Sequence, residues 1–331
     1  MDTPFFSVIS PNFNSGKKLL RAAQSLSRNK VSFEHIVVDD CSTDGSFNLP
    51  CELESSTILV RNEKNLGPGP SRNKGLEIAR GRYVIFMDSD DFFMPLALDL
   101  IHHALMSEGC PDVFIFGYYF NRSGRHDNLE DDVKVEMSYY KLLDGEVLLR
   151  KYFLDEIVSA PWGKCLSSHL AKGARFPSLR VSQDAFYNLD VFLKAESTII
   201  SDDKLYVFDK SDSKSLTSRP FDYSEFKKFY RSWIAFERKV LSDTALIKYR
   251  DLVYARKIKF CVLYYMNRLA LTPEAERDSR VVAFVKALFL RNIWLARRNL
   301  SGKSIAASFL FCIVPKITLL VLRSRLLKGS K

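Results

Sequence analysis

Residues 65–95 read NLGPGPSRNKGLEIARGRYVIFMDSDDFFMP. A loop rich in Gly and Pro comes first, and a helix is predicted over residues 71–81. The apolar run at 81–88 predicts a buried strand, which ends abruptly in the carboxylates of Asp88, Asp90 and Asp91. Clustered carboxylates repel one another unless a ligand or solvent neutralises them. Because α/β sheets bind ligands where their strands end, this stretch predicts a site at the mouth of the strand.

The same alternation of strand and helix continues on both sides of this stretch. Further strands are predicted at 5–13, 33–40, 56–62 and 111–120, and further helices at 17–28 and 96–108. Alternating elements of this kind indicate an α/β fold with a mostly parallel, Rossmann-like sheet flanked by helices. Polar loops follow three of the strands, so one edge of the sheet gathers the residues that could bind a ligand. After about residue 220 the alternation stops, and the sequence predicts helices.

The 331-residue chain carries a net charge of +10, which is unevenly distributed. Residues 221–331 hold 23 Lys and Arg against 8 Asp and Glu, whereas residues 1–220 hold 26 against 31. A hydrophobic content of 47% is ample for a core, so we expect one large domain with an appendage, or two domains. The six Cys lack zinc spacing and the chain opens without a signal-like segment, which favours free thiols in a reducing compartment.

Asp88 and Asp90 in the DSDD turn are separated by a single residue, a spacing that can hold a hard divalent cation. We expect Mg²⁺ or Mn²⁺, with substrate phosphates completing the coordination. The alternative is an acidic turn that caps the following helix, since Asp suits the N-cap position. The location at the end of a buried strand favours the metal site.

Two further motifs point to the same edge of the sheet. In IVVDDCSTDGS (36–46), Asp40 follows a strand and could accept hydrogen bonds from a nucleobase or ribose, although the rest of the motif is ordinary turn chemistry. In NLGPGPSRNKG (65–75), Arg72 follows the Gly-rich loop, where a guanidinium and backbone N–H groups suit a phosphate or carboxylate. The alternative for Arg72 is an ordinary surface residue.

Taken together, FFSVISPNFN (5–14), IVVDDCSTDGS and the stretch 65–95 resemble glycosyltransferase family 2 in order and spacing. The resemblance is close over about residues 5–120 and weaker to about residue 219. It implies the glycosyltransferase A fold, a nucleotide-sugar donor and an inverting mechanism. It also implies a catalytic domain at 1–219, whose donor half ends and acceptor half begins at about residue 120, and a basic helical region at 220–331.

The resemblance implies a role for each donor-side residue. These residues are Pro11, Phe13, Asp40, Arg72, Asp88, Ser89 and Asp90. Phe13 would stack on the base with Pro11 beside it, and Asp40 would read the base or the ribose. Asp90 would be the direct metal ligand, whereas Asp88 would contact the ribose or metal-bound water. Family members usually have Tyr where Phe13 stands, so the stacking face is kept and a hydroxyl is lost.

The segment APWGKCLSSHLAKGARFPSLRVSQDAFY (160–187) resembles the acceptor side of the same family. Trp162 and Lys164 match its first part, and Gln183 replaces the Glu that usually precedes the catalytic Asp. The resemblance implies that Asp184 is the general base that deprotonates the acceptor hydroxyl. The alternative is that Asp184 caps a helix predicted at 184–196, and the two roles are compatible.

The segment VFDKSDSKSLTSR (207–219) carries a weaker signal. Family members often have a basic loop here that closes over the diphosphate, and Lys214, Ser215 and Thr217 occupy its place. The match is loose, and a solvated loop is the alternative.

Residues 286–331 interleave apolar and basic side chains, and from Val281 onward the chain has 10 basic residues and no acidic one. The apolar run at 305–322 is marginal for a membrane span, which needs about 20 residues, and Lys316 interrupts it. We expect this region to lie on an anionic membrane surface, with packing on the catalytic domain or a dimer as the alternative. We find no nucleic-acid-binding module and expect no nucleic-acid partner.

The sequence thus predicts a metal-dependent inverting glycosyltransferase that is peripheral on the cytoplasmic face of the membrane. We expect it to move a sugar from a nucleotide-sugar, with UDP-sugars favoured, to a hydroxyl of a lipid-linked oligosaccharide or polysaccharide, as in capsule or lipopolysaccharide synthesis. A nucleotidyltransferase should carry a GxGxRL-type loop, which SPNFNSGKK (10–18) does not supply. A non-catalytic carbohydrate- or partner-binding relative should lack Asp88, Asp90 or Asp184, and all three are present.

Overall fold

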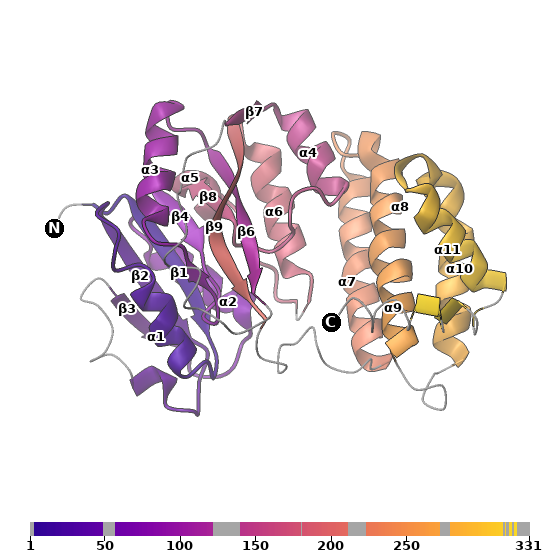
Figure 1. The fold of residues 1–331 in the computed structure, drawn as a ribbon, viewed down its shortest axis with the longest axis horizontal. Coiled ribbons are helices and arrows are strands. Elements are labelled where there is room, and N and C mark those ends of the chain that lie inside the picture. Colours follow the sequence, from indigo (N-terminus) through magenta and orange to yellow (C-terminus); the bar gives the residue numbers. More distant parts are fainter. Residues whose placement is uncertain are drawn as a thin grey trace. The chain divides into compact units, whose positions relative to one another are not determined.

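Figure 1 shows the chain in a computed structural model. The structure describes residues 3–48, 57–121, 140–179, 181–210, 223–271 and 279–313, together with 315, 318–319 and 321–322. These residues fall into two compact units. We call them the α/β unit, which comprises Met1–Leu149 and Val158–Ser215, and the helical unit, which comprises Arg150–Ile157 and Leu216–Lys331.

The first half of the α/β unit is a parallel sheet. It consists of β1 (Phe6–Asn12), β2 (Phe33–Asp39), β3 (Thr57–Arg61) and β4 (Tyr83–Phe86). β1 lies in the middle, with Phe6 aligned to Phe33 of β2 on one side and to Tyr83 of β4 on the other. Because these strands are parallel, the loops that follow β1, β2 and β4 meet at one edge.

The second half of the sheet is mixed. It adds β5 (Phe92–Phe93), β6 (Val113–Asn121), β7 (Lys141–Leu143), β8 (Lys164–Ser167) and β9 (Thr198–Asp209), in the overall order β3-β2-β1-β4-β8-β6-β9-β5 with β7 beside β9. β8 is antiparallel to both β4 and β6, whereas β6 and β9 are parallel. The predicted α/β fold is confirmed, and half of the strand pairs are parallel, a smaller share than in the mostly parallel sheet that we expected.

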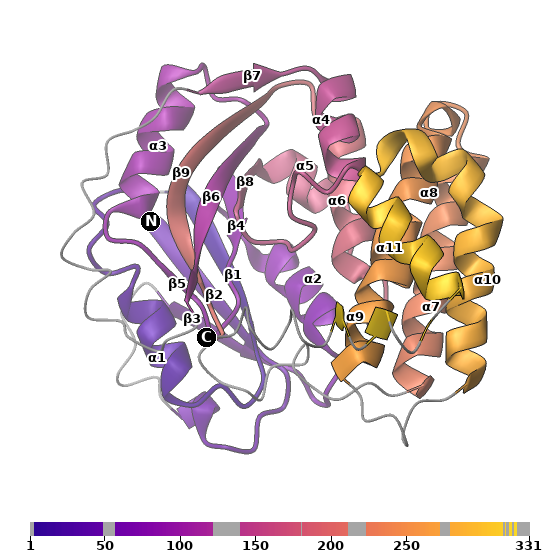
Figure 2. The same ribbon diagram turned by 45° about the vertical axis from the view of Figure 1, so that its right-hand side comes forward.

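Helices cover both faces of this sheet (Figure 2). One face is covered by α1 (Lys17–Gln24) and α3 (Ala97–Ser107), and the other by α2 (Pro68–Ile78), α5 (Ser168–Gly173) and α6 (Gln183–Lys194). The short α4 (Gly145–Phe153) follows β7. On the first face, Ala22 of α1 and Ile101 of α3 are fully buried with Phe6 in the main apolar core.

Helix α2 begins earlier than the sequence pattern predicted, at Pro68 rather than at residue 71. A proline in the first turn removes no hydrogen bond that the helix needs, so the Gly-Pro loop starts the helix directly. Gly75 then lets α2 approach the sheet closely, because a Cβ atom there would lie 2.4 Å from Cγ2 of Ile9. This close packing fixes the position of Arg72 one turn earlier.

The helical unit consists almost entirely of helices. They are α7 (Tyr223–Ser242), η4 (Ile247–Tyr249), α8 (Arg250–Ile258), the π-helical η5 (Lys259–Leu263), α9 (Tyr264–Leu271), α10 (Ser279–Ala296), η7 (Arg297–Asn299) and α11 (Gly302–Ile313). Arg256 of α8 is buried, donates to the carbonyl of Tyr152, and lies 3.7 Å from the carboxylate of Asp155. Through these contacts the segment 150–157 belongs to this unit. None of the helices that the structure describes is long and apolar enough to cross a membrane.

Candidate active site

The loops after β1, β2 and β4 are held together by side-chain hydrogen bonds. Ser15 Oγ lies 2.6 Å from Ser89 Oγ, which joins the first loop to the DSDD turn. Asn12 Nδ2 donates to Asp39 at 2.8 Å, and the backbone N–H of Asn14 donates to Ser42 at 3.0 Å. Three motifs that are distant in the sequence therefore form one edge, as predicted from the parallel strands.

Arg72 lies at the centre of this edge and bridges two carboxylates. Its Nη2 atom donates to Asp88 at 2.6 Å and its Nη1 atom donates to Asp184 at 3.1 Å. The guanidinium is buried and lies 5.4 Å from the ring centroid of Phe176. Burial disfavours its charge, but the two carboxylates outweigh that cost and raise the pKa of Arg72. The alternative of a surface Arg is wrong.

Asp184 lies in the first turn of α6 and keeps 29% of its side chain exposed. Burial raises the pKa of Asp184 above its ordinary value, and the positive charge of Arg72 opposes this effect. The N-cap of α6 is Ser182, so the alternative in which Asp184 is the cap is wrong. A partly exposed carboxylate with a raised pKa, held by a hydrogen-bonded arginine, has the properties of a general base.

The DSDD turn is anchored from beneath by residues that the sequence analysis did not single out. Tyr206 of β9 is buried, and its hydroxyl accepts from the N–H of Asp88 at 3.1 Å and donates to Asp91 at 2.7 Å. Asp91 also accepts from the N–H of Asp209 at 2.8 Å. Burial, and then the charges of its neighbours, raise the pKa of Asp91 well above its ordinary value. The turn leads into β5 rather than directly into α3, so its alternative role as a helix cap is wrong.

Asp90 is the carboxylate with the fewest protein partners at this edge. Within the described part of the chain, its carboxylate forms no ion pair and no hydrogen bond to another residue, and only its carbonyl accepts from Arg21, at 2.7 Å. Burial and the charge of Asp88 raise the pKa of Asp90. A cation beside Asp90 and Asp88 would relieve this repulsion, so the two carboxylates fit a divalent metal that is completed by phosphates. No group of three His, Cys, Asp or Glu converges on a metal position among the described residues.

Asp40 is buried and holds the loop before α2. Its carboxylate accepts from the backbone N–H groups of Leu66 at 2.8 Å and Gly67 at 2.7 Å, and from Asn62 Nδ2 at 2.8 Å. These bonds fix the start of α2, and therefore the position of Arg72 relative to the ends of the strands. The predicted contact of Asp40 with a base or ribose stays a prediction.

The other predicted donor residues flank this centre. Pro11 is buried in β1, and Phe13, just beyond the strand, is 50% exposed with its ring available for contact. Ser89 is buried and uses its hydroxyl for the bond to Ser15. The donor-closing role of Lys214, Ser215 and Thr217 falls outside the described residues.

The predicted acceptor-side residues are turned mainly into the protein. Trp162 is buried in an aromatic cluster, stacked on Tyr206 with ring centroids 5.2 Å apart. Lys164 is fully buried, and its amine donates to the carbonyls of Val158, Ala160 and Trp162 at 2.8, 2.7 and 3.3 Å. Burial lowers the pKa of Lys164 to about 7, and the charge of Asp184 opposes this shift. The side chains of Trp162 and Lys164 therefore contact other parts of the protein and stabilise the elements around the site.

Gln183 packs on the first turn of α2 and so connects the two halves of the unit. A Cβ atom on Gly69 would lie 2.0 Å from Gln183 Oε1, which shows how closely the two elements approach. Gln183 is buried, and its Oε1 atom has no hydrogen-bond partner within the described residues. Its neutral side chain adds no charge beside Asp184, where a Glu would add a second carboxylate.

Comparison with known proteins is consistent with this geometry. The family described as Glycosyl transferase family 2 matches residues 7–157, which include β2 to β4, the DSDD turn and all of β1 except its first residue. The putative teichuronic acid biosynthesis glycosyltransferase TuaG of Bacillus subtilis is 37% identical over 111 residues, which are 32% of this chain and 44% of that protein. The poly(ribitol-phosphate) beta-glucosyltransferase of Bacillus spizizenii is 28% identical over 275 residues, which are 79% of this chain and 39% of that protein.

Among solved structures, S. aureus TarS 1–349 in complex with UDP-GlcNAc has the same fold. The TM-score is 0.68 at 21% sequence identity, and the alignment covers 98% of this chain and 92% of that chain. The chain matches less than two thirds of the length of three of the curated relatives, since the aligned parts cover 44%, 30% and 63% of them.

Proposed function

Residues 7–157 place the chain in glycosyl transferase family 2, and from this premise we propose that it transfers a sugar from a nucleotide-sugar donor to a hydroxyl group of a surface glycan. The observation that carries the proposal is the bridge that Arg72 makes between Asp88 and Asp184. A donor-side carboxylate and a candidate base are thereby held around one guanidinium. An inverting displacement needs this proximity, because the hydroxyl that the base deprotonates attacks the same sugar carbon that the diphosphate leaves.

The donor would bind at the edge formed by β1, β2 and β4. Phe13 offers an exposed ring for the base, and Asp40 holds the backbone of Leu66 and Gly67 in place. The Arg72 guanidinium, which pairs with Asp88, would lie beside a diphosphate bound at that carboxylate. We favour a UDP-sugar, because UDP-GlcNAc is the ligand of the TarS structure whose fold this chain shares.

Asp90 and Asp88 would hold Mg²⁺ or Mn²⁺ together with the donor phosphates. Such a cation would neutralise the charge of the departing diphosphate. Hydrogen bonds within the protein hold the DSDD turn in position for this role. Tyr206 bonds to Asp88 and Asp91, and Ser89 bonds to Ser15 of the loop after β1.

Asp184 would accept the proton of the acceptor hydroxyl as that oxygen attacks the sugar. The raised pKa of Asp184 brings its basicity closer to neutral pH, where proton transfer from a reacting hydroxyl is more favourable. Arg72 limits this shift and keeps the carboxylate oriented toward the donor. Because the acceptor oxygen would attack the sugar carbon directly, with Asp184 as its base, the expected outcome is inversion at the transferred carbon.

The acceptor would be a lipid-linked oligosaccharide or a polysaccharide, reached at the cytoplasmic face of a membrane. Two relatives are described by their roles with teichuronic acid and poly(ribitol-phosphate), which are the grounds for a surface polymer here. The helical unit exposes Trp294 by 72%, with Arg297 stacked 3.6 Å from its ring, and exposes Ile313 by 75%. Exposed Trp beside cationic residues suits an anionic lipid surface.

Thermal unfolding tests the donor site directly. The protein is heated with UDP-, GDP- and TDP-sugars, each with and without Mn²⁺, because a ligand that binds only the folded state raises Tm. The proposal predicts a rise in Tm with one nucleotide class that requires metal and is lost in Asp90→Ala. A well-folded sample that shows no shift with any nucleotide would instead support a binding protein without transferase activity.

A further inference from the structure

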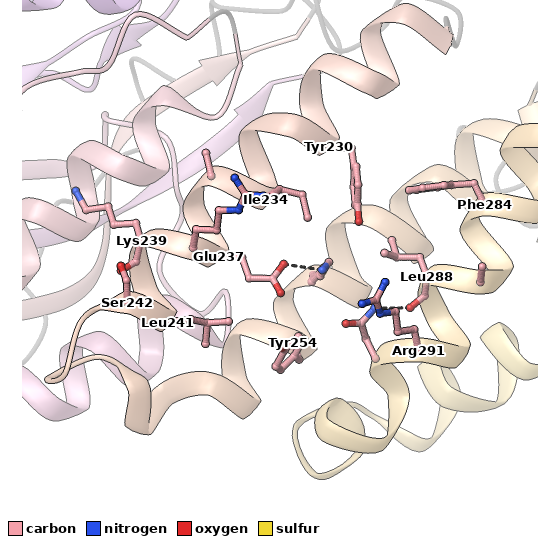
Figure 3. A pocket seen from close by; sticks show the side chains of 15 residues that line it. Tyr230, Ile234, Glu237, Lys239, Leu241, Ser242, Tyr254, Phe284, Leu288 and Arg291 are labelled. Carbon is pink, nitrogen blue, oxygen red and sulfur yellow. Dashed lines mark hydrogen bonds and ion pairs between the residues drawn. The ribbon is translucent and has the colours of Figure 1, made fainter.

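A cavity of about 990 Å³ lies in the helical unit among α7, α8 and α10 (Figure 3). Its volume is at the upper end of the range of about 300–1,000 Å³ in which ligand pockets fall. All of its lining residues belong to the helical unit. No residue assigned above to the donor, the metal or the base contributes to it.

The wall of this cavity has an excess of positive charge. It contains Arg238, Lys239, Lys257 and Arg291 and a single acidic residue, Glu237. Lys257 and Glu237 form an ion pair of 2.5 Å in which the side chains are 6% and 12% exposed, so these two charges compensate each other. Arg238 and Arg291 are exposed and form no ion pair or hydrogen bond within the described residues. Two guanidinium groups thus remain for a ligand that brings its own negative charge.

Aromatic rings form the apolar part of the wall. Tyr230 and Phe284 meet edge to face with ring centroids 4.9 Å apart, and Lys257 Nζ lies 5.9 Å from the ring centroids of both Tyr230 and Tyr254. Figure 3 shows the hydroxyl end of Tyr230 directed toward the cavity. Burial raises the pKa of Tyr230 and Tyr254, and Arg291 opposes the shift, so both hydroxyls stay protonated and able to donate at neutral pH.

This combination selects a particular ligand chemistry. The planar guanidinium of Arg pairs with phosphate oxygens in a bidentate fork, which a single ammonium cannot do. Ring faces beside hydroxyl donors suit a carbon skeleton that carries many hydroxyls. A lone phosphate would fill only a small part of 990 Å³. The charged groups on several sides of the cavity disfavour acyl chains.

We propose that this cavity binds a phosphodiester-linked polyol or glycan chain, with Arg238 and Arg291 on its phosphates and Tyr230 and Tyr254 against its polyol units. The inference rests on the proposed function, because such a chain would be the acceptor that the α/β unit glycosylates. Binding to the cavity would hold a polymeric acceptor on the enzyme between successive transfers.

The test is titration of the full chain with a synthetic glycerol phosphate hexamer, without nucleotide-sugar, followed by calorimetry. In Arg238→Gln/Arg291→Gln we expect the Kd to rise about tenfold or more, since hydrogen bonds to charged groups are lost. The matched control is Arg298→Gln/Lys303→Gln, which removes the same charge from exposed positions of the same unit outside the cavity. Its Kd should change by less than about threefold. Tyr254→Phe, which keeps the ring and loses the hydroxyl, should weaken binding by a smaller factor.

Three results would overturn the inference. The first is an equal loss of hexamer binding in the cavity variant and the control variant, which would mean unspecific attraction of charge. The second is cavity-dependent binding to phosphatidylglycerol vesicles but not to the hexamer, which would assign the site to lipid. The third is tighter cavity-dependent binding of a single-stranded oligonucleotide of equal charge. Failure of the proposed function is distinguishable, because it would abolish the donor-dependent rise in Tm and leave hexamer binding intact.

Discussion

The two units use charge in opposite ways. At the edge of the α/β sheet, Arg72 is buried and shared by Asp88 and Asp184, at distances of 2.6 and 3.1 Å. In the helical unit, Arg238 and Arg291 are exposed at a cavity that offers a single, already paired, carboxylate. A paired charge is held in one geometry, which reacting groups need, whereas an unpaired charge is free to meet a ligand.

This difference predicts different responses to mutation. Removing one member of a buried group of charges leaves its partners unsatisfied or misplaced. In the α/β unit such a change should therefore have a large effect on the transfer rate or on the free energy of unfolding. Removing an exposed cation should change only the affinity for an anionic partner, by a small factor that salt also changes.

The largest expected effect follows from Asp184→Asn. The amide keeps the shape of the carboxylate but cannot accept a proton, so the rate of nucleoside diphosphate release with acceptor should fall by about 10²–10⁴-fold. Tm should change little, because the amide oxygen of the variant can still accept from Arg72, and Arg72 keeps Asp88 as its charged partner. Asp190→Asn, six positions further along the same helix, is the control. Retention of the full rate in Asp184→Asn would remove this residue as the base.

The pH profile sharpens the same assignment. Asp184 acts as a base only when it is unprotonated, and burial raises its pKa, so kcat/KM should fall as the pH drops through that raised value. The fall should therefore begin at a higher pH than for an ordinary Asp, whose pKa is about 3.9. In Arg72→Met the opposing positive charge is lost and the acid limb should move to still higher pH. An acid limb that does not move in this variant would contradict the coupling between the two residues.

Lys164→Met tests whether a buried cation in the α/β unit is structural. The variant leaves three carbonyls without their donor, so the free energy of unfolding should fall by about 2–4 kcal/mol. Urea denaturation measures this directly. Lys172→Met is the matched control, because Lys172 is exposed and its amine donates to a single carbonyl, that of Ala79. An equal fall in the free energy of unfolding in the two variants would contradict a larger structural role for the buried amine than for the exposed one.

Asp90→Asn should change metal dependence more than stability. The Kd for the donor in the presence of Mn²⁺ should rise about tenfold or more, because an amide is a poorer ligand than a carboxylate for a hard cation, and losing even an outer-shell partner of a metal ligand costs about 10–100-fold in affinity. EDTA should then have little further effect on the variant. Asp202→Asn, at an exposed position of β9, is the control. Donor binding that is equally sensitive to EDTA in the wild type and in Asp90→Asn would place the metal elsewhere.

The smallest effect is expected for the basic surface of the helical unit. Each exposed cation near an anionic bilayer contributes about 1 kcal/mol, so Arg298→Gln should weaken binding to phosphatidylglycerol vesicles about fivefold at moderate salt. Lys141→Gln, an exposed lysine of the α/β unit, should have no effect on vesicle binding. Sedimentation with vesicles measures both. Similar losses in the two variants would contradict a membrane-facing role that is specific to the helical unit.

The sequence was most informative where local chemistry and strand order agree. Asp88, Arg72 and Asp184 are distant in the chain, yet parallel strands and a recognisable set of motifs predicted that they belong to one site. The structure brings all three together. Arg72 was expected in a first turn, whereas α2 begins at Pro68, because the Gly-Pro loop is itself the start of the helix.

Other features depend on contacts that no local pattern encodes. Tyr206 lies in an alternating strand and looks like a core residue, so its hydrogen bonds to the DSDD turn could not be anticipated. Lys164 looks like an acceptor-side cation, but the chain from 158 to 162 turns its carbonyls onto the amine. The cavity of the helical unit arises from the packing of α7, α8 and α10, whose basic residues are spread over more than 50 positions in sequence.

The configuration of the product tests the central claim most directly. The α-linked nucleotide-sugar that stabilises the protein is incubated with enzyme and acceptor, and the anomeric proton of the transferred sugar is followed by NMR from the first turnover. A single displacement, with Asp184 as the base across the sugar from the leaving diphosphate, predicts a β-linked product. An α-linked product would mean that the configuration is retained, and it would contradict the site built around Arg72, Asp88 and Asp184.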